Sequence, residues 1–154
     1  MPVTPLPPLV HFSTEGEYRV HYELKFCRDS LLTFDDIPVR FRIRHFDHCM
    51  FESNRRNGVK DRFSQRRAQR MDWIRATLIN LNSNPRQGWD AKNNCIDPNR
   101  RVAVLFERFV VVIRCWWKDT EKLEAEFVTC FIADDEEIIR LIRAKPKWRK
   151  EDCR

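Results

Sequence analysis

The sequence predicts a single α+β domain in which helices pack on one face of an antiparallel sheet. Three observations lead to this fold class. Between residues 101 and 131, three apolar segments separated by short polar turns are typical of a three-strand antiparallel meander. Between residues 64 and 82, apolar side chains recur at spacings of three and four, which indicates an amphipathic helix. The acidic run Asp134–Glu137 precedes a second apolar helical pattern, so we expect a C-terminal helix over 134–145.

The size and composition of the chain fit one domain spanning residues 1–154. The 154 residues are 42% hydrophobic, which is enough to close a core. No apolar run is long enough to cross a membrane, and the proline-rich start lacks the features of a signal peptide, so we expect a cytoplasmic protein. The cysteines show no repeated short spacing, which predicts reduced, mostly buried thiols rather than a disulfide framework.

The N-terminal part is expected to contribute strands. Residues 1–9 form a proline-rich arm, and 10–43 contain two strand patterns. The first, over residues 17–26, alternates and would place five apolar side chains on one face: Tyr18, Val20, Tyr22, Leu24 and Phe26. A turn at Asp35 and Asp36 leads to a second strand over 39–43, which could pair with the first in antiparallel fashion.

Residues 44–83 are expected to form the helical segment that carries the site. Residues 44–53 read as a short helix or an irregular turn, followed by a polar loop. Ser64 is a good N-cap for the long helix, and Pro85 forces the chain out of helical geometry beyond it. Its apolar stripe consists of Met71, Ile74, Leu78 and Leu81. The stretch 89–99 is predicted to be a loop.

Two arginines of the long helix are expected to face inward. At about 100° per residue, Arg70 falls within roughly 40° of Ile74, and Arg67 projects between Ile74 and Leu78. A guanidinium turned inward is costly unless it pairs with an acid or lines a wet cleft that receives an anion such as phosphate. The alternative is that both side chains reach solvent at the edge of the stripe or pair with acids such as Asp72 or Glu52.

The charge of the chain favours a polyanionic partner. The net charge is +6, and the basic excess is concentrated between Arg40 and Arg75. Such a concentration attracts nucleic acid through the release of counterions from phosphates. The alternative is that the charge serves only solubility.

Two histidines are candidates for proton transfer. His45 and His48 share a face if their segment is helical, and an imidazole can take a proton from a ribose hydroxyl or return one to a leaving oxygen. Either could also be an exposed histidine without a role. A zinc site built from His45, His48 and Cys49 is a further alternative, but it lacks a convincing fourth ligand.

Three further residues complete the candidate set. Thr129 is expected on the inward face of the last strand, beside Ala125, Phe127 and Phe131, where a hydroxyl could hold a phosphate oxygen. Lys60 lies in the loop before the long helix, and Arg101 begins the meander, where a cation could reach a groove between helix and sheet. The alternatives are a core threonine and two solvated charges.

The order "FDHCMFES", a basic loop with Lys60, "RRAQRMDWI", "FVVVIRCWW" and "AEFVTCF" resembles the BECR superfamily, the metal-independent nucleases typified by barnase, colicin D and RelE-type toxins, and in particular its phage- and toxin-associated branches. The resemblance covers roughly residues 46–133. It implies RNA cleavage to a 2′,3′-cyclic phosphate, with His48 as the helix histidine, Arg67 and its neighbour Arg70 as the helix arginines, and Thr129 as the late-strand hydroxyl. Where relatives often carry a tyrosine, this chain has Phe131.

We therefore expect a small metal-independent endoribonuclease, a hydrolase-type toxin that needs no cofactor and is restrained by an acidic antitoxin or inhibitor protein. His48, Lys60, Arg67, Arg70 and Thr129 would form the catalytic set, and His45 and Arg101 would bind substrate phosphates. The alternative is a nucleic-acid- or protein-binding module without turnover, in which Trp89, Trp116 and Trp117 stack on bases. A two-metal DNA nuclease is disfavoured because the chain lacks a cluster of carboxylates for the ions.

Overall fold

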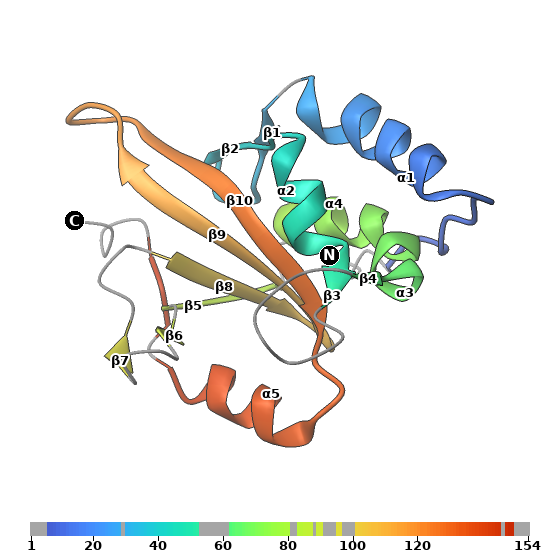
Figure 1. Ribbon diagram of the computed structural model, residues 1–154. Helices are drawn as coiled ribbons and strands as arrows, with labels where there is room; N and C mark the ends of the chain where they lie inside the picture. Colours follow the sequence, from blue (N-terminus) through green and yellow to red (C-terminus); the bar gives the residue numbers. More distant parts are fainter. Residues whose placement is uncertain are drawn as a thin grey trace.

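A computed structural model describes residues 6–28, 30–52, 62–80, 83–87, 89–90, 95–96, 101–145 and 147–149. The helices are α1 (Glu15–Tyr22), which continues as the π-helix η1 (Glu23–Cys27), α2 (Arg44–Cys49), α3 (Gln65–Gln69), α4 (Met71–Ile79) and α5 (Glu136–Arg143). The strands are β1 (Leu31–Leu32), β2 (Pro38–Arg40), β3 (Phe51–Glu52), β4 (Arg62–Phe63), β5 (Asn84–Gln87), β6 (Trp89–Asp90), β7 (Cys95–Ile96), β8 (Arg101–Phe106), β9 (Phe109–Trp117) and β10 (Leu123–Ile132). Figure 1 shows the helices arranged around one central sheet.

The main sheet has six strands in the order β1-β2-β10-β9-β8-β5. Its centre is the antiparallel meander β8-β9-β10, as the alternation predicts. The turn between β8 and β9 places Glu107 at a φ of 55°, in the left-handed region that a tight hairpin demands. The α+β fold class is confirmed, but the sheet is mixed, because β2 pairs with β10 in parallel.

Strand β5 was not expected, because its segment contains a proline. Pro85 has no N–H to donate, and this is tolerated because β5 is the last strand of the sheet, next to β8. The carbonyl of Pro85 accepts from the Trp148 N–H at 3.0 Å. Within the predicted loop over 89–99, the short strands β6 and β7 pair with each other.

The predicted strand over residues 17–26 is wrong, because this segment is helical. Tyr18, Tyr22 and Phe26 are at most 2% exposed, whereas Val20 and Leu24 are 54% and 49% exposed. A spacing of four matches both a strand face and a helix face, and burial follows the helical period. Thr14 caps α1 by accepting from the Glu17 N–H at 3.2 Å. The antiparallel partner of β2 is therefore the short β1.

The long helix predicted from Ser64 onwards is two helices with a break at Arg70. Ser64 is the N-cap, as predicted, and its hydroxyl accepts from the Arg67 N–H at 3.3 Å. Arg70 has a φ of −99° and a ψ of 17°, which ends α3 and starts α4 at Met71. Met71, Ile74 and Leu78 are buried as expected. The fourth member of the stripe, Leu81, lies outside the described residues.

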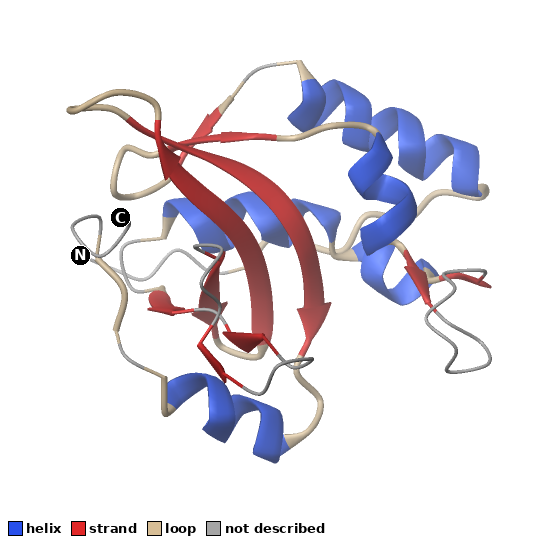
Figure 2. Cartoon of the chain, turned by 60° about the vertical axis from the view of Figure 1, so that its left-hand side comes forward, coloured by secondary structure: helices blue, strands red, loops and turns tan. Residues whose placement is uncertain are grey.

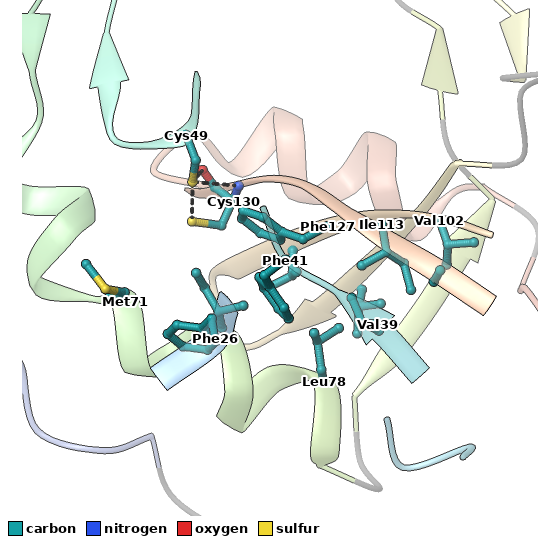
Figure 3. Packing of buried hydrophobic residues seen from close by; sticks show 14 of the residues in the cluster. Phe26, Val39, Phe41, Cys49, Met71, Leu78, Val102, Ile113, Phe127 and Cys130 are labelled. Carbon is teal, nitrogen blue, oxygen red and sulfur yellow. Dashed lines mark hydrogen bonds between the residues drawn. The ribbon is translucent and has the colours of Figure 1, made fainter. Parts of the chain in front are cut away.

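The helices cover both faces of the sheet, so the prediction that they share one face is wrong. The larger core packs α1, η1, α2 and α4 on one face, and Figure 3 shows Phe26, Phe41 and Phe127 within it. A smaller cluster packs Ile139 of α5 against Leu105 and Val110 on the other face. Helix α5 is set apart from the remaining helices in both views of the chain (Figures 1 and 2). The predicted C-terminal helix itself is confirmed, with Asp135 as its N-cap.

Candidate active site

The C-terminal end of α2 lies against the edge of β10, and Cys49 makes the contact. Its sulfur is 2.9 Å from the sulfur of Cys130 and accepts from the Cys130 N–H at 3.3 Å. Figure 3 shows these contacts beside the buried core. Both cysteines are free thiols with no exposed surface. We call this cluster, together with Arg67 and Thr129, the Cys49 centre.

The Cys49 centre favours negative charge on one sulfur. Burial opposes ionisation of Cys49, but the Cys130 thiol and N–H, the Thr129 hydroxyl and the charge of Arg67 together lower its pKa below the ordinary value. Burial and the neighbouring Cys49 raise the pKa of Cys130. The donors and the cation around Cys49 therefore oppose the effect of its burial on ionisation.

Arg67 reaches the Cys49 centre, as its inward projection predicts. The side chain is half-buried, and its Nη1 donates to the Cys49 carbonyl at 3.3 Å. This arrangement depends on the Ser64 cap, which fixes the first turn of α3. The guanidinium thus sits between α3, the end of α2 and β10.

Thr129 also lies at the Cys49 centre, because of a change in strand register that the sequence does not predict. A β-bulge between Phe127 and Thr129 shifts the register, so that Thr129 pairs with Val112 and Cys130 with Val111. The expectation that Thr129 shares an inward face with Ala125 and Phe127 is therefore wrong, whereas Thr129 does share a face with Phe131, because their partners Val112 and Val110 both belong to the α5 cluster. Phe127 and Cys130 belong to the larger core, whereas Phe131 packs against the α5 cluster. The hydroxyl of Thr129 instead lies at the strand edge beside Cys49.

His48 directly precedes Cys49 and is exposed on α2. Arg67 and Thr129 therefore interact with Cys49, whereas His48 is its neighbour along the chain and has an exposed side chain. Arg70 is not part of this contact: it occupies the break between α3 and α4, donates to the Arg66 carbonyl at 2.8 Å and lies 5.1 Å from the ring of Trp73.

The acids expected to neutralise these arginines have other partners or are not described. Asp72 contacts His21 at 2.8 Å, and nothing is described for the side chain of Glu52. On the surface of α3, Arg66 pairs with Asp134 through two hydrogen bonds of 2.8 and 2.7 Å. Lys60 lies outside the described residues, and its role stays a prediction.

His45 is held in place by two partners. Its Nδ1 accepts from the Arg42 N–H at 3.2 Å, and its Nε2 lies 3.1 Å from a carboxylate oxygen of Glu126. Burial lowers the pKa of His45, against the opposing effect of Glu126. Because both ring nitrogens are engaged, this imidazole orients the start of α2 more readily than it exchanges a proton with a substrate.

Glu126 also faces three arginines. Arg42, Arg44 and Arg114 approach its carboxylate at 3.4, 3.3 and 3.7 Å. The Glu126 side chain is 13% exposed, whereas the arginine side chains are 50 to 71% exposed. The surface at this point of the sheet therefore presents cations above a covered carboxylate.

Arg101 belongs to the same surface. It pairs in register with Arg114, which pairs with Glu126, which in turn pairs with Arg40 across the parallel contact to β2. Residues directly opposite each other in a sheet point to the same face. We call this surface the arginine face; it consists of Arg40, Arg42, Arg44, Arg101, Arg114 and Glu126.

Sequence reasoning singled out Arg67, Thr129, His45 and Arg101. It missed Cys49 and Cys130 as the groups at which Arg67 and Thr129 meet, and Glu126 as the partner of His45 and of the arginine face. The alternation of β10 predicts that Glu126 lies on the polar face of the strand. The residues that contact Glu126 could not be predicted, because the spacing within a strand does not determine its register with strands distant in the sequence.

Neither a metal site nor a membrane span is found in the part of the chain that the structure describes. No three His, Cys, Asp or Glu side chains there gather as a metal ion would require, and this includes the zinc alternative at His45, His48 and Cys49. No described helix is long and apolar enough to cross a bilayer.

Comparison of the chain with protein-family models, with curated proteins and with solved structures finds no match.

Proposed function

We propose that this protein is a metal-independent endoribonuclease whose cleavage site is the Cys49 centre with His48. The observation that carries the proposal is that Arg67 and Thr129, from two separate segments, meet at Cys49, the residue that directly follows His48 on α2. A cation, a hydroxyl and an imidazole are the groups that phosphoryl transfer from an internal nucleophile needs.

The order of elements supports the resemblance to the BECR superfamily. Helices α2, α3 and α4 precede the antiparallel strands β8, β9 and β10 along the chain. Within this arrangement the residues that match the family's helix histidine, helix arginine and late-strand hydroxyl are His48, Arg67 and Thr129. This chain thus resembles the BECR superfamily in its residue pattern and in the order of its elements, and we propose the RNA cleavage that this resemblance implies.

The proposed chemistry uses the ribose of the RNA as nucleophile. His48 takes the proton of the 2′-hydroxyl or returns a proton to the 5′-oxygen that leaves, and the phosphorus–oxygen bond is exchanged to give a 2′,3′-cyclic phosphate. Arg67 carries the charge that develops on the phosphate, in the environment that also favours an anionic Cys49 sulfur. Thr129 positions a phosphate oxygen, and Lys60 and Arg70 add positive charge.

We also propose that such an enzyme acts as a toxin and is held inactive by an acidic protein. The net charge of +6 suits an acidic antitoxin or inhibitor as well as RNA. Growth of a bacterial host that expresses the wild-type chain or the Arg67→Ala variant tests this: the wild-type chain should slow growth and the variant should not. Equal growth would contradict the toxin part of the proposal.

Cleavage is tested with purified full-length protein and single-stranded RNA in EDTA. The wild-type chain should produce fragments with 2′,3′-cyclic phosphate ends and should leave DNA of the same sequence intact. His48→Asn should lower the rate by roughly 10²- to 10⁴-fold, as expected for loss of a general acid or base. His11→Asn, a change at another exposed histidine, is the matched control and should cleave at the wild-type rate.

Two outcomes would contradict the proposal. An absence of cutting by the wild-type chain on any RNA would remove the enzyme class. Cutting at the same rate by His48→Asn and His11→Asn, prepared identically, would remove His48 from the reaction and point to a contaminating nuclease.

A further inference from the structure

The arginine face lies outside the Cys49 centre, on the half of its sheet face that α5 leaves uncovered. Strand β9 shows the division: Val110 and Val112 pack in the α5 cluster, whereas Arg114, two residues further along the same face, is exposed. Trp116 follows at the next position of that face and is half-buried. The guanidinium of Arg114 lies 5.7 Å from the centre of its ring.

The charges of this surface are predominantly positive. Of its five exposed arginines, three approach the carboxylate of Glu126. The other acid of the face, Glu124, lies opposite Trp116 and pairs with Lys118 at 3.5 Å. A shared carboxylate holds several guanidinium groups in fixed positions, because each bond restrains a long side chain. It cannot neutralise them all, so the surface keeps a net positive potential.

The face continues into a polar cleft of about 410 Å³ between η1 and the segment after β2. Its lining includes Arg28, Arg40 and Arg42, with Glu23 as the opposing acid. Arg40 and Arg42 belong to both the cleft and the arginine face. Arginines of β8, β9 and β2, with Glu126 of β10 between them, therefore lead from Arg101 to a hollow large enough for a phosphate group.

We propose that the arginine face and this cleft bind the backbone of a single-stranded nucleic acid, with one base stacked on Trp116. Arginines spaced along adjacent strands match a chain of phosphates, since each guanidinium can donate two hydrogen bonds to one phosphate. An indole beside them offers a stacking surface to an unpaired base, which a duplex does not present. Charge complementarity selects a polyanion, and the ring selects a single strand.

Helix α2 connects this surface to the proposed cleavage site. Arg44 and His48 are four residues apart and therefore lie on one side of the helix, and His48 acts electrostatically on His45. A strand bound across the arginine face can thus be directed along α2 towards His48. The binding inference does not depend on cleavage, because it rests on different residues.

The test measures binding of an uncleavable 2′-O-methyl RNA of about 12 nucleotides by fluorescence anisotropy over a series of salt concentrations, with DNA of the same sequence as a second arm. Arg101→Gln/Arg114→Gln should weaken binding and lower the slope of log Kd against log salt by about 1.4, the value for two lost phosphate contacts. Trp116→Leu should weaken binding roughly ten-fold or more. Equally tight binding of the 2′-O-methyl RNA and the DNA means that the protein recognises the phosphate backbone. A preference for one of them means that it also contacts the sugar.

The control Arg143→Gln/Lys147→Gln removes the same charge from exposed positions elsewhere and should keep the wild-type slope apart from a small general effect. Arg101→Lys/Arg114→Lys should restore most of the slope, which a merely structural role would not predict. The inference is overturned if the glutamine pair binds like the control pair, or if a duplex binds as tightly as the single strand and Trp116→Leu has no effect. His48→Asn should bind like the wild type, so loss of cleavage and loss of binding are separate results.

Discussion

The helical character of residues 15–27 can be tested by comparing two apolar side chains that lie two positions apart. In the structure Phe26 is 2% exposed and packs against Tyr22 and Phe41 at ring distances of 5.6 and 5.0 Å, whereas Leu24 is 49% exposed. Removing a buried phenylalanine costs about 3–5 kcal/mol, through lost burial and the cavity that remains. Removing a half-exposed leucine costs under about 1 kcal/mol, because little area leaves the core.

Urea unfolding followed by circular dichroism gives the loss in free energy of unfolding for each variant, and thermal unfolding gives the shift in melting temperature. For a chain of this size, Phe26→Ala should lower the melting temperature by on the order of 10 °C and Leu24→Ala by only a few degrees. If residues 17–26 formed a strand instead, Leu24 and Phe26 would lie on the same buried face, and the two losses would be comparable. Equal losses would therefore refute the helical assignment, and a large gap between them supports it.

Two further results follow from single contacts. Ser64→Ala removes the acceptor of the Arg67 N–H and should destabilise the fold by about 1 kcal/mol, whereas Ser64→Thr keeps the acceptor and should cost less; equal losses in urea titrations would argue against the cap. Because burial lowers the pKa of His45 below its ordinary value of 6.5, the unfolded chain takes up that proton first and stability falls as the pH drops through about 6.5. His45→Asn removes this titration and should flatten the dependence of melting temperature between about pH 7.5 and about pH 5.5; an unchanged slope would mean that His45 does not contribute.

The meander and the C-terminal helix could be predicted because their patterns have a single interpretation. Segments such as "FVVVIRCWW" are long, rich in β-branched residues and bounded by tight turns, which suits only a strand. The segment with Tyr18, Tyr22 and Phe26 satisfies two periods at once. Packing on the core stabilises it as a helix, and the local spacing of apolar residues does not contain this information.

The candidate site was predictable in its residue types and less so in its geometry. Arg67 is half-buried and reaches the Cys49 carbonyl, but the break at Arg70 interrupts the helix over which its projection was counted and removes Arg70 from the same contact. The role of Cys49 as the meeting point of three segments depends on a β-bulge, and a one-residue bulge leaves no trace in the alternation of β10. Glu126 likewise became a centre only through pairing with strands distant in the sequence.

The measurement that tests the proposed function most directly is the single-turnover rate of RNA cleavage in EDTA by Arg67 variants. Loss of one preorganised charge at the reacting phosphate should slow Arg67→Gln by roughly 10²- to 10³-fold, and Arg67→Lys should recover part of the rate. Arg143→Gln, on the exposed side of α5, should cleave as fast as the wild type. If Arg67→Gln, shown to be folded, cleaves as fast as Arg143→Gln, the proposal that RNA is cut at the Cys49 centre is wrong.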